Sequence, residues 1–350
     1  MKVAITGASG FLGSHCVAKA VEKGHLVRVL VRDPEKTTAA LEMHRIKKDL
    51  VEIVYADLAD ERSLDSGLEG VDTLLHTAAI FSLSPLDAKS MISINPSSTK
   101  TLLTSAVKHE LKQTVYVSTM GVFAPISGGD INENTETSTG LGPYTKSKIE
   151  SEKIARDFQH GGAPVNIVYP GGIFGPKDPN PNLSDSMGML TEILKRNLGL
   201  TASSAKLAMV DVRDVADVCV GALEVESKNA RYHAWGELVT MDQVIDLVKK
   251  ITDRNIRFYS TPLFLLDAMG TFGEVFTLAT RIRLPFAKES MKMFTQNARV
   301  NGPGKIDQSR ANTDFGFQNI SLEESLRDAL LWLHQAGHLT DKQSGKLANI

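Results

Sequence analysis

Three glycines close to the N-terminus restrict the fold of this chain more than any other feature. They stand in TGASGFLG, residues 6–13, between a first β-branched run and a helical pattern over residues 11–23. In such a strand–loop–helix unit, Gly7 permits the tight turn, Gly10 lets the backbone approach a pyrophosphate, and Gly13 lets the helix pack close to the strand. The helix N-terminus adds N–H donors and the positive end of a dipole. The alternative is a turn that merely needs glycine, and the position of the loop disfavours it.

The first half of the chain alternates β-branched runs with helical patterns, which is typical of a parallel sheet covered on both faces. We expect strands at 3–6, 26–31, 51–55, 72–76, 114–118 and 164–169, and helices at 11–23, 88–109 and 143–160. Pro96 should start the second of these helices late or kink it. The predicted fold class is therefore α/β, with a Rossmann-type doubly wound parallel sheet.

The alternation ends near residue 170, where a stretch rich in Gly, Pro and Asn (170–182) predicts a loop. Further helical patterns follow at 186–197, 214–224, 241–251 and 321–335. We expect a cofactor domain and a smaller, mostly helical C-terminal substrate lobe. Their expected bounds are 1–170 with 205–235 for the domain, 171–204 and 236–337 for the lobe, and 338–350 for a frayed polar tail.

Composition excludes several classes of protein. Hydrophobic residues make up 42% and charged residues 23% of the 350, so the chain is not largely disordered. The formal charge of −2 gives no basic field for nucleic acid. Cys16 and Cys219 cannot form a disulfide framework, and no metal-ligand spacing surrounds them. With no signal-peptide pattern at the start, we expect a reducing, cytoplasmic location and no metal.

One stretch, residues 262–286, is unusually apolar. Four charged residues interrupt it, which argues against an integral membrane span: Asp267, Glu274, Arg281 and Arg283. We expect one or two helices of the substrate lobe there. Two interpretations stay open, namely ordinary lobe core, and a hydrophobic lid or membrane-surface contact.

The end of the second strand indicates which dinucleotide would bind. An acidic residue at this tip holds a ribose 2′-hydroxyl, whereas an arginine holds a 2′-phosphate. Arg32 and Asp33 both stand there, Arg32 first, and Arg28 and Lys36 add positive charge in the sequence nearby. We therefore favour NADP over NAD, with Arg32 as the phosphate ligand and Asp33 turned toward solvent. The alternative is that Arg32 is a solvated turn residue.

Tyr144 and Lys148 are four residues apart and share one helix face. Hydride transfer to a carbonyl produces an alkoxide that must be protonated, and a phenol is a poor acid because its pKa is about 10. An adjacent ammonium would lower that pKa, so we expect Lys148 to act on Tyr144 and to bind the nicotinamide ribose. The hydroxyl of Thr119, at the end of the fifth strand, would hold the substrate oxygen. An exposed helical pair is the alternative.

Other residues should contact the dinucleotide because they open the first helix or follow strand ends: Phe11 and Leu12, Asp57 and Leu58, and Ala78 and Ala79. The small side chains of the last pair would let backbone lie close to the cofactor. His76 is expected to be a packed histidine.

Together these residues resemble the extended short-chain dehydrogenase/reductase family, within the NAD-dependent epimerase/dehydratase superfamily. The match covers the chain to about residue 333 and includes the glycine loop, the Ser118-Thr119 pair, the tyrosine–lysine helix, PGGIFGP at 170–176 and DVRDVA at 211–216. The resemblance implies a nicotinamide cofactor, with Tyr144 as catalytic acid/base beside Thr119 and Lys148. It also implies cofactor contacts at Pro170 and Ile173, and a possible homodimer through helices 88–109 and 143–160.

Within the family the chain looks most like the dihydroflavonol-4-reductase branch, through VRDP at 31–34 and the pattern over 307–335. Two departures matter. Thr119 replaces the commoner serine. Pro96 follows Asn95, which puts in question the family role of that asparagine in positioning the lysine.

These observations favour an NADPH-dependent reductase of a bulky, largely apolar ketone or aldehyde. A nucleotide-sugar epimerase that retains NAD is one alternative. A dehydratase is disfavoured because Met120-Gly121, rather than acidic residues, follows Thr119. A non-catalytic scaffold that senses the cofactor is the other alternative, although it would not need the tyrosine–lysine pair. We expect Phe81, Phe174 and the loop 123–142 to border the substrate.

Overall fold

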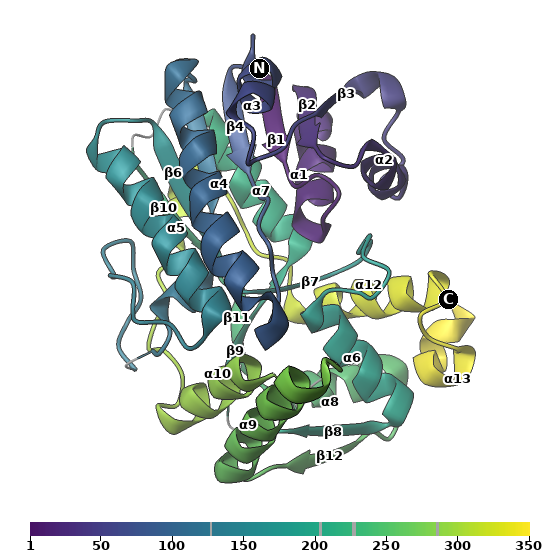
Figure 1. Ribbon diagram of the computed structural model, residues 1–350. Coiled ribbons are helices and arrows are strands. Elements are labelled where there is room, and N and C mark those ends of the chain that lie inside the picture. Colours follow the sequence, from purple (N-terminus) through teal and green to yellow (C-terminus); the bar gives the residue numbers. More distant parts are fainter. Residues whose placement is uncertain (127, 203–204, 226–228, 285–286) are drawn as a thin grey trace.

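A computed structural model describes residues 1–126, 128–202, 205–225, 229–284 and 287–350. Its centre is a seven-stranded sheet in the order β10-β6-β5-β4-β1-β2-β3, in which every neighbouring pair is parallel (Figure 1). The strands are β1 (Lys2–Thr6), β2 (Leu26–Val31), β3 (Val51–Tyr55), β4 (Thr73–His76), β5 (Gln113–Val117), β6 (Val165–Pro170) and β10 (Arg231–Ala234). The chain order reverses beside β1, as a doubly wound sheet requires, so the predicted fold class is confirmed.

Helices cover both faces of this sheet because its strands are apolar on both sides. Val3 and Ile5 of β1 pack into the layer formed by α1 (Phe11–Glu22) and α7 (Val212–Glu224). Ala4, which points the opposite way, packs into the layer on the other side of the sheet. That second layer contains α3 (Glu61–Leu68), α4 (Ala88–Lys108) and α5 (Pro143–His160). The sequence did not predict α3 or α2 (Pro34–Glu42).

Helix α4 begins at Ala88 and continues through Pro96, so the proline does not delay its start. The helix has one N–H donor fewer at this position. It also packs along α5, and in proteins tertiary packing supplies most of the stability of a helix.

The remaining residues form a second lobe with two small sheets. One contains β7 (Gly172–Phe174), β9 (Lys206–Asp211) and β11 (Glu237–Thr240), and the other contains β8 (Leu198–Thr201) and β12 (Arg257–Ser260). Around them lie α6 (Asp185–Arg196), α8 (Met241–Thr252), α9 (Leu263–Thr280), α10 (Lys288–Arg299) and α12 (Leu322–Gln335), whereas α11 (Ser309–Phe315) packs against α7 and β10 of the main sheet. The stretch 170–182 is thus not entirely loop, since β7 lies within it.

The C-terminal tail corrects a second expectation, because it is packed rather than frayed. It forms α13 (Asp341–Ser344) and a 3-10 turn over Gly345–Asn349. Leu339 and Leu347 are buried, and Arg254 donates a hydrogen bond to the carbonyl of Gln343. The polar composition of the tail gave no indication that Leu339 and Leu347 would be buried.

Within the described residues, one helix is long and apolar enough to cross a membrane by length and composition, namely α9, of which 22% is buried. The expected helix in 262–286 is therefore present, while Pro285 and Phe286 lie outside the described residues.

Candidate functional site

The glycine loop joins β1 to α1 at the carboxyl edge of the main sheet. Gly7 has φ +77°, a left-handed conformation in which a side chain would be strained. A Cβ on Gly13 would lie 2.1 Å from the carbonyl oxygen of Gly7, so only glycine permits this contact between loop and helix. Helix α1 begins at Gly10 with no side-chain cap and no acidic residue in its first turn. Its N–H donors, with Phe11 and Leu12 leading the helix, therefore fit an anion such as a dinucleotide pyrophosphate.

The side chains at and near the tip of β2 differ in their contacts. Arg32 is exposed, and it forms no hydrogen bond or ion pair with another residue that the structure describes. Asp33 is exposed, as expected, and its Oδ1 accepts the N–H of Lys36 at 2.9 Å, which caps α2. Arg28 does not add charge at this tip, which is a correction. Its side chain instead bonds Glu52 and the carbonyl of Gly67.

The loops after β3 and β4 border the same edge. The Thr77 hydroxyl donates to the carbonyl of Thr6 at 2.7 Å, which holds the β4 loop, with half-buried Ala78 and exposed Ala79, against the glycine loop. Asp57 is half-buried, and its Oδ1 accepts the N–H of Ala59 within its own turn. The adjacent side chain of Leu58 packs against the core.

His76 is packed, as predicted. It is buried, and its Nδ1 lies 2.8 Å from the hydroxyl oxygen of Thr6. Burial, followed by the charge of Lys148, lowers the pKa of His76 to about 3, so the ring is neutral.

Tyr144 lies in the first turn of α5, where Pro143 begins the helix. Its phenol lies near the side chain of Thr119, which follows β5 and lowers the pKa of the phenol. Its ring meets the ring of Phe81 edge to face, with centroids 4.6 Å apart. Phe81 is 50% exposed, so it can still contact a ligand beside the phenol. The fold thus brings Thr119, Tyr144 and Phe81 together, as the sequence predicted.

The expected effect of Lys148 on Tyr144 is wrong in this structure. Burial is the largest influence and raises the pKa of Tyr144 to about 12, while the side chain of Thr119 opposes it and the charges of Glu289 and Asp185 add to it. The Nζ of Lys148 instead donates to the carbonyl of Val117 at 2.8 Å. Tyr144 is therefore a neutral phenol, which is the protonation state that a proton donor needs.

Lys148 is buried one turn further along α5 than Tyr144. Its Nζ lies 4.6 Å from the ring centre of Tyr116. Burial lowers the pKa of Lys148 to about 7, against a smaller opposing effect from Glu152. This lysine can therefore gain or lose a proton near neutral pH.

Glu152 is a residue that the sequence reasoning missed. It is fully buried, and its carboxylate accepts hydrogen bonds from Ser118 at 2.7 Å, Tyr169 at 2.9 Å and Arg156 at 3.0 Å. It follows Lys148 by four residues, so spacing on the helix could have revealed it. The carboxylate ties α5 to the ends of β5 and β6.

Glu289 of α10 is a second missed residue. Its carboxylate is buried and accepts the N–H groups of Tyr144 at 3.0 Å and Thr145 at 2.8 Å, together with the Thr145 hydroxyl at 2.7 Å. A Cβ on Gly142 would lie 2.5 Å from this carboxyl group. The substrate lobe thus caps the helix that carries Tyr144. No local sequence signal could have paired residues 145 positions apart.

The side-chain hydrogen bonds of Asn95 go to Ile80 and Ser147 rather than to Lys148. Its side-chain nitrogen donates to the carbonyl of Ile80 at 3.0 Å and to the Ser147 hydroxyl at 3.1 Å, and its oxygen accepts the Ile80 N–H. Asn95 therefore ties the segment that carries Phe81 to α5.

The segment 170–176 places its predicted residues differently. Pro170 is buried at the end of β6, and Ile173 is half-buried against the core beside α1 and α7. Phe174 does not border a substrate space, which is a correction. It is 0% exposed and packs with Met187 and Leu190 in the core of the second lobe, because alternation along β7 turns it inward.

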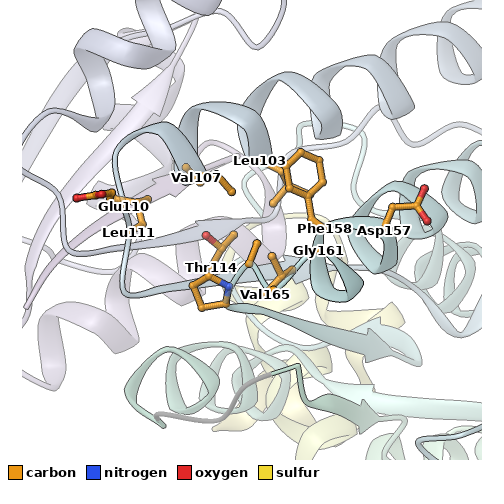
Figure 2. A pocket seen from close by; sticks show the side chains of 13 residues that line it. Leu103, Val107, Glu110, Leu111, Thr114, Asp157, Phe158, Gly161 and Val165 are labelled. Carbon is orange, nitrogen blue, oxygen red and sulfur yellow. The ribbon is translucent and has the colours of Figure 1, made fainter.

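A surface groove lies elsewhere on the cofactor domain. It has a volume of about 480 Å³ and is lined by the C-terminal ends of α4 and α5 and the first residues of β5 and β6, including Leu103, Val107, Thr114, Phe158 and Val165 (Figure 2). These are the amino ends of the strands, opposite the edge that carries Thr119 and the glycine loop. The groove is therefore separate from the candidate site.

Comparisons with known proteins agree with this geometry. The family model described as "NAD dependent epimerase/dehydratase family" matches residues 3–235. Sterol demethylase protein B of Methylococcus capsulatus is 26% identical, with 96% of this chain and 99% of that protein covered. Cinnamoyl-CoA reductase 1 of Arabidopsis thaliana is 27% identical, with 96% and 90% covered. Other relatives include a dihydroflavonol 4-reductase of Dianthus caryophyllus.

A solved structure shows the same fold over nearly the whole chain. UDP-glucuronic acid 4-epimerase from Bacillus cereus, in complex with UDP-glucuronic acid and NAD, superposes with a TM-score of 0.74 at 18% identity, covering 96% of this chain and 100% of that one. The glycine loop, the tyrosine–lysine helix and the family match point the same way. The chain belongs to the NAD-dependent epimerase/dehydratase family and is an NAD(P)-dependent enzyme that acts on CH–OH and C=O groups.

Proposed function

We propose that the protein is an NADPH-dependent reductase of a bulky, largely apolar ketone or aldehyde. The observation that carries the proposal is the position of Tyr144, which lies in the first turn of α5 near Thr119 and against Phe81, at the same sheet edge as the open N-terminus of α1. Relatives named as reductases of a cinnamoyl thioester and of a dihydroflavonol support the direction of the reaction.

The roles of the residues follow from their contacts. In this proposal the Thr119 hydroxyl and the Tyr144 phenol together hold the carbonyl oxygen, and the phenol donates the proton that this oxygen needs. Lys148, with a pKa near 7, can return a proton toward the site. When bound, the nicotinamide supplies the hydride. Phe81 shields one side of the phenol from water.

The preference for NADPH rests on Arg32. Its guanidinium is exposed at the tip of β2 with no partner among the described residues, so it can bind a 2′-phosphate without breaking an existing bond. The carboxylate of Asp33 is already engaged in capping α2, which leaves it less able to hold a ribose hydroxyl.

The test is a titration of the purified protein with NADPH and NADH, followed by a panel of aryl and alicyclic carbonyl compounds read as loss of nicotinamide absorbance. Tighter binding of NADPH and turnover of an apolar carbonyl support the proposal. NAD that stays bound through purification, with no net change in absorbance on any carbonyl, would indicate an epimerase. Failure to bind either nicotinamide would contradict both the enzyme and the cofactor-sensing scaffold.

We also propose a cytoplasmic homodimer in which α4 and α5 pair across a two-fold axis. Ile94 of α4 is exposed and offers an apolar side chain to such a pairing. Analytical ultracentrifugation of the wild type and of Ile94→Glu tests the pairing, and an unchanged oligomer in the variant would contradict it.

A further inference from the structure

Helix α9 has its apolar side chains on the outside (Figure 1 shows it at the end of the molecule away from the N-terminus). Besides Leu266, the residues that it buries are small: Gly270, Gly273 and Thr277. A Cβ on Gly270 would lie 3.0 Å from the Cβ of Met291, so α9 and α10 approach closely through this small side. Phe264 and Phe272, by contrast, are 74% and 64% exposed. Helices of soluble proteins normally turn their large apolar side chains inward.

The exposed face of α9 carries no charge. Its largest residues are Phe264, Leu265, Phe272, Val275 and Leu278. The two acidic residues of the helix lie at the edge of this face, half-buried, and each forms an ion pair with α10: Asp267 with Arg299, and Glu274 with Lys288. The spacing Phe264, Ala268, Phe272 and Val275 places these residues on one side of the helix.

The charge around this face is positive, although the whole chain has a formal charge of −2. The hairpin of α9 and α10, residues 263–299, contains five basic and three acidic residues. Asp267 and Glu274 pair with Arg299 and Lys288 of α10, and Glu289 lies buried at the start of α5. Arg283 pairs with Asp87, so the excess positive charge of the hairpin falls on Arg281, exposed immediately after the helix ends, and on half-buried Lys292.

We propose that α9 lies flat on the surface of an anionic lipid bilayer. Large apolar side chains turned outward, with small ones at the helix–helix contact, are the arrangement of helices that face lipid. Phenylalanine and leucine on one face, with arginine beside them, are typical of interfacial helices. A second copy of the chain fits less well because two positive hairpins would repel each other. The ion pairs to α10 hold the helix on the protein, so it rests on the bilayer rather than crossing it.

The hairpin also contacts the candidate site. Arg283 forms an ion pair with Asp87, which precedes α4, and α10 supplies Glu289 to the helix of Tyr144. A bilayer under α9 would therefore lie on the substrate-lobe side of the site. This inference goes beyond the proposed reduction and does not depend on it, because lipid binding is measured without cofactor or carbonyl compound.

The experiment is sedimentation of the full chain with two kinds of vesicle, one of phosphatidylcholine alone and one of phosphatidylcholine mixed with phosphatidylglycerol. We expect binding to the anionic vesicles and at least about tenfold weaker binding for the double variant Phe264→Gln, Phe272→Gln, because two aromatic rings leave the apolar phase. Arg281→Glu should reduce binding to anionic vesicles and leave binding to neutral vesicles unchanged, and added salt should do the same.

The matched control is Leu26→Gln with Leu50→Gln, two exposed apolar residues of the cofactor domain. This control should bind like the wild type. Thermal unfolding shows whether each variant is folded. We expect all of them to fold because the substituted side chains are exposed. Equal loss in both double variants, or no binding of the wild type to either vesicle, would overturn the proposal. So would a dimer that dissociates in the α9 variant without any vesicle binding, because the face would then serve a second copy.

Discussion

Helices α1 and α5 both begin at a glycine that provides no side-chain cap, yet their N-termini are in opposite states. At α1, Gly10 is followed by a first turn without acidic residues, and the donors are open. At α5, Gly142 leaves room for the carboxylate of Glu289, which occupies the donors from another lobe. The same backbone feature thus serves an external anion at one helix and an internal one at the other. The open end fits the cofactor, and the filled end fixes the helix of Tyr144 to the substrate lobe.

Tyr144→Phe tests most strongly whether the filled end serves the chemistry. The variant keeps the ring against Phe81 and the cap by Glu289 but removes the proton donor. We expect turnover to fall by about 10²–10⁴-fold, the range for loss of a general acid. Isothermal titration should show unchanged nicotinamide binding. Retained turnover would mean that the proton comes from another group.

Gly13→Ala tests the open end. The added Cβ would lie 2.1 Å from the carbonyl of Gly7, so loop and helix must separate. We expect nicotinamide binding to become undetectable by fluorescence titration and the free energy of unfolding to fall by about 1–3 kcal/mol. Gly188→Ala is the control because a Cβ at that helical position meets nothing within 4 Å. Normal cofactor binding by Gly13→Ala would show that the loop does not hold the pyrophosphate.

Arg32→Ala tests whether the dinucleotide that binds at the N-terminus of α1 carries a 2′-phosphate. Removing a guanidinium that contacts a phosphate should weaken NADPH by roughly tenfold or more and leave NADH nearly unchanged. Arg28→Ala is the control, because that side chain already bonds Glu52 and the carbonyl of Gly67. Equal losses for both nucleotides in Arg32→Ala would contradict the assignment.

Glu289→Gln should have the smallest effect and probes the coupling between the two lobes. The charge of Glu289 raises the pKa of Tyr144, so its removal should lower that pKa from about 12. The phenol then loses its proton at lower pH, and the alkaline limb of the reduction profile moves to lower pH. Stability should fall by about 1 kcal/mol, as for loss of a helix cap.

Glu237→Gln is the matched control for this substitution. Its carboxylate accepts the N–H of Leu322 at the start of α12 and does not influence Tyr144. It should lower stability similarly without moving the pH profile. A profile that stays fixed in Glu289→Gln would reduce Glu289 to a structural cap.

The sequence predicted the parts of the molecule that depend on local pattern. The strands at 26–31 and 51–55 and the helix beginning at Pro143 agree with the structure, because β-branched runs and helix-start signals are local. Phe174 was misplaced because alternation along a three-residue strand cannot be recognised inside a glycine-rich stretch.

The site was predictable only where its members lie near one another or end neighbouring strands. Thr119 and Tyr144 could be paired because the ends of parallel strands share one edge. The cap by Glu289 and the altered direction of the Tyr144 pKa depend on contacts between lobes and on burial, neither of which is written in the spacing of residues.

The two thiols described at the outset have a practical consequence. Cys16 of α1 and Cys219 of α7 are fully buried in one core cluster between these two helices. A maleimide dye can reach neither sulfur until α1 moves away from α7. The labelling rate of the unmodified chain, followed with and without nicotinamide, therefore reports how often α1 separates from α7 below the glycine loop.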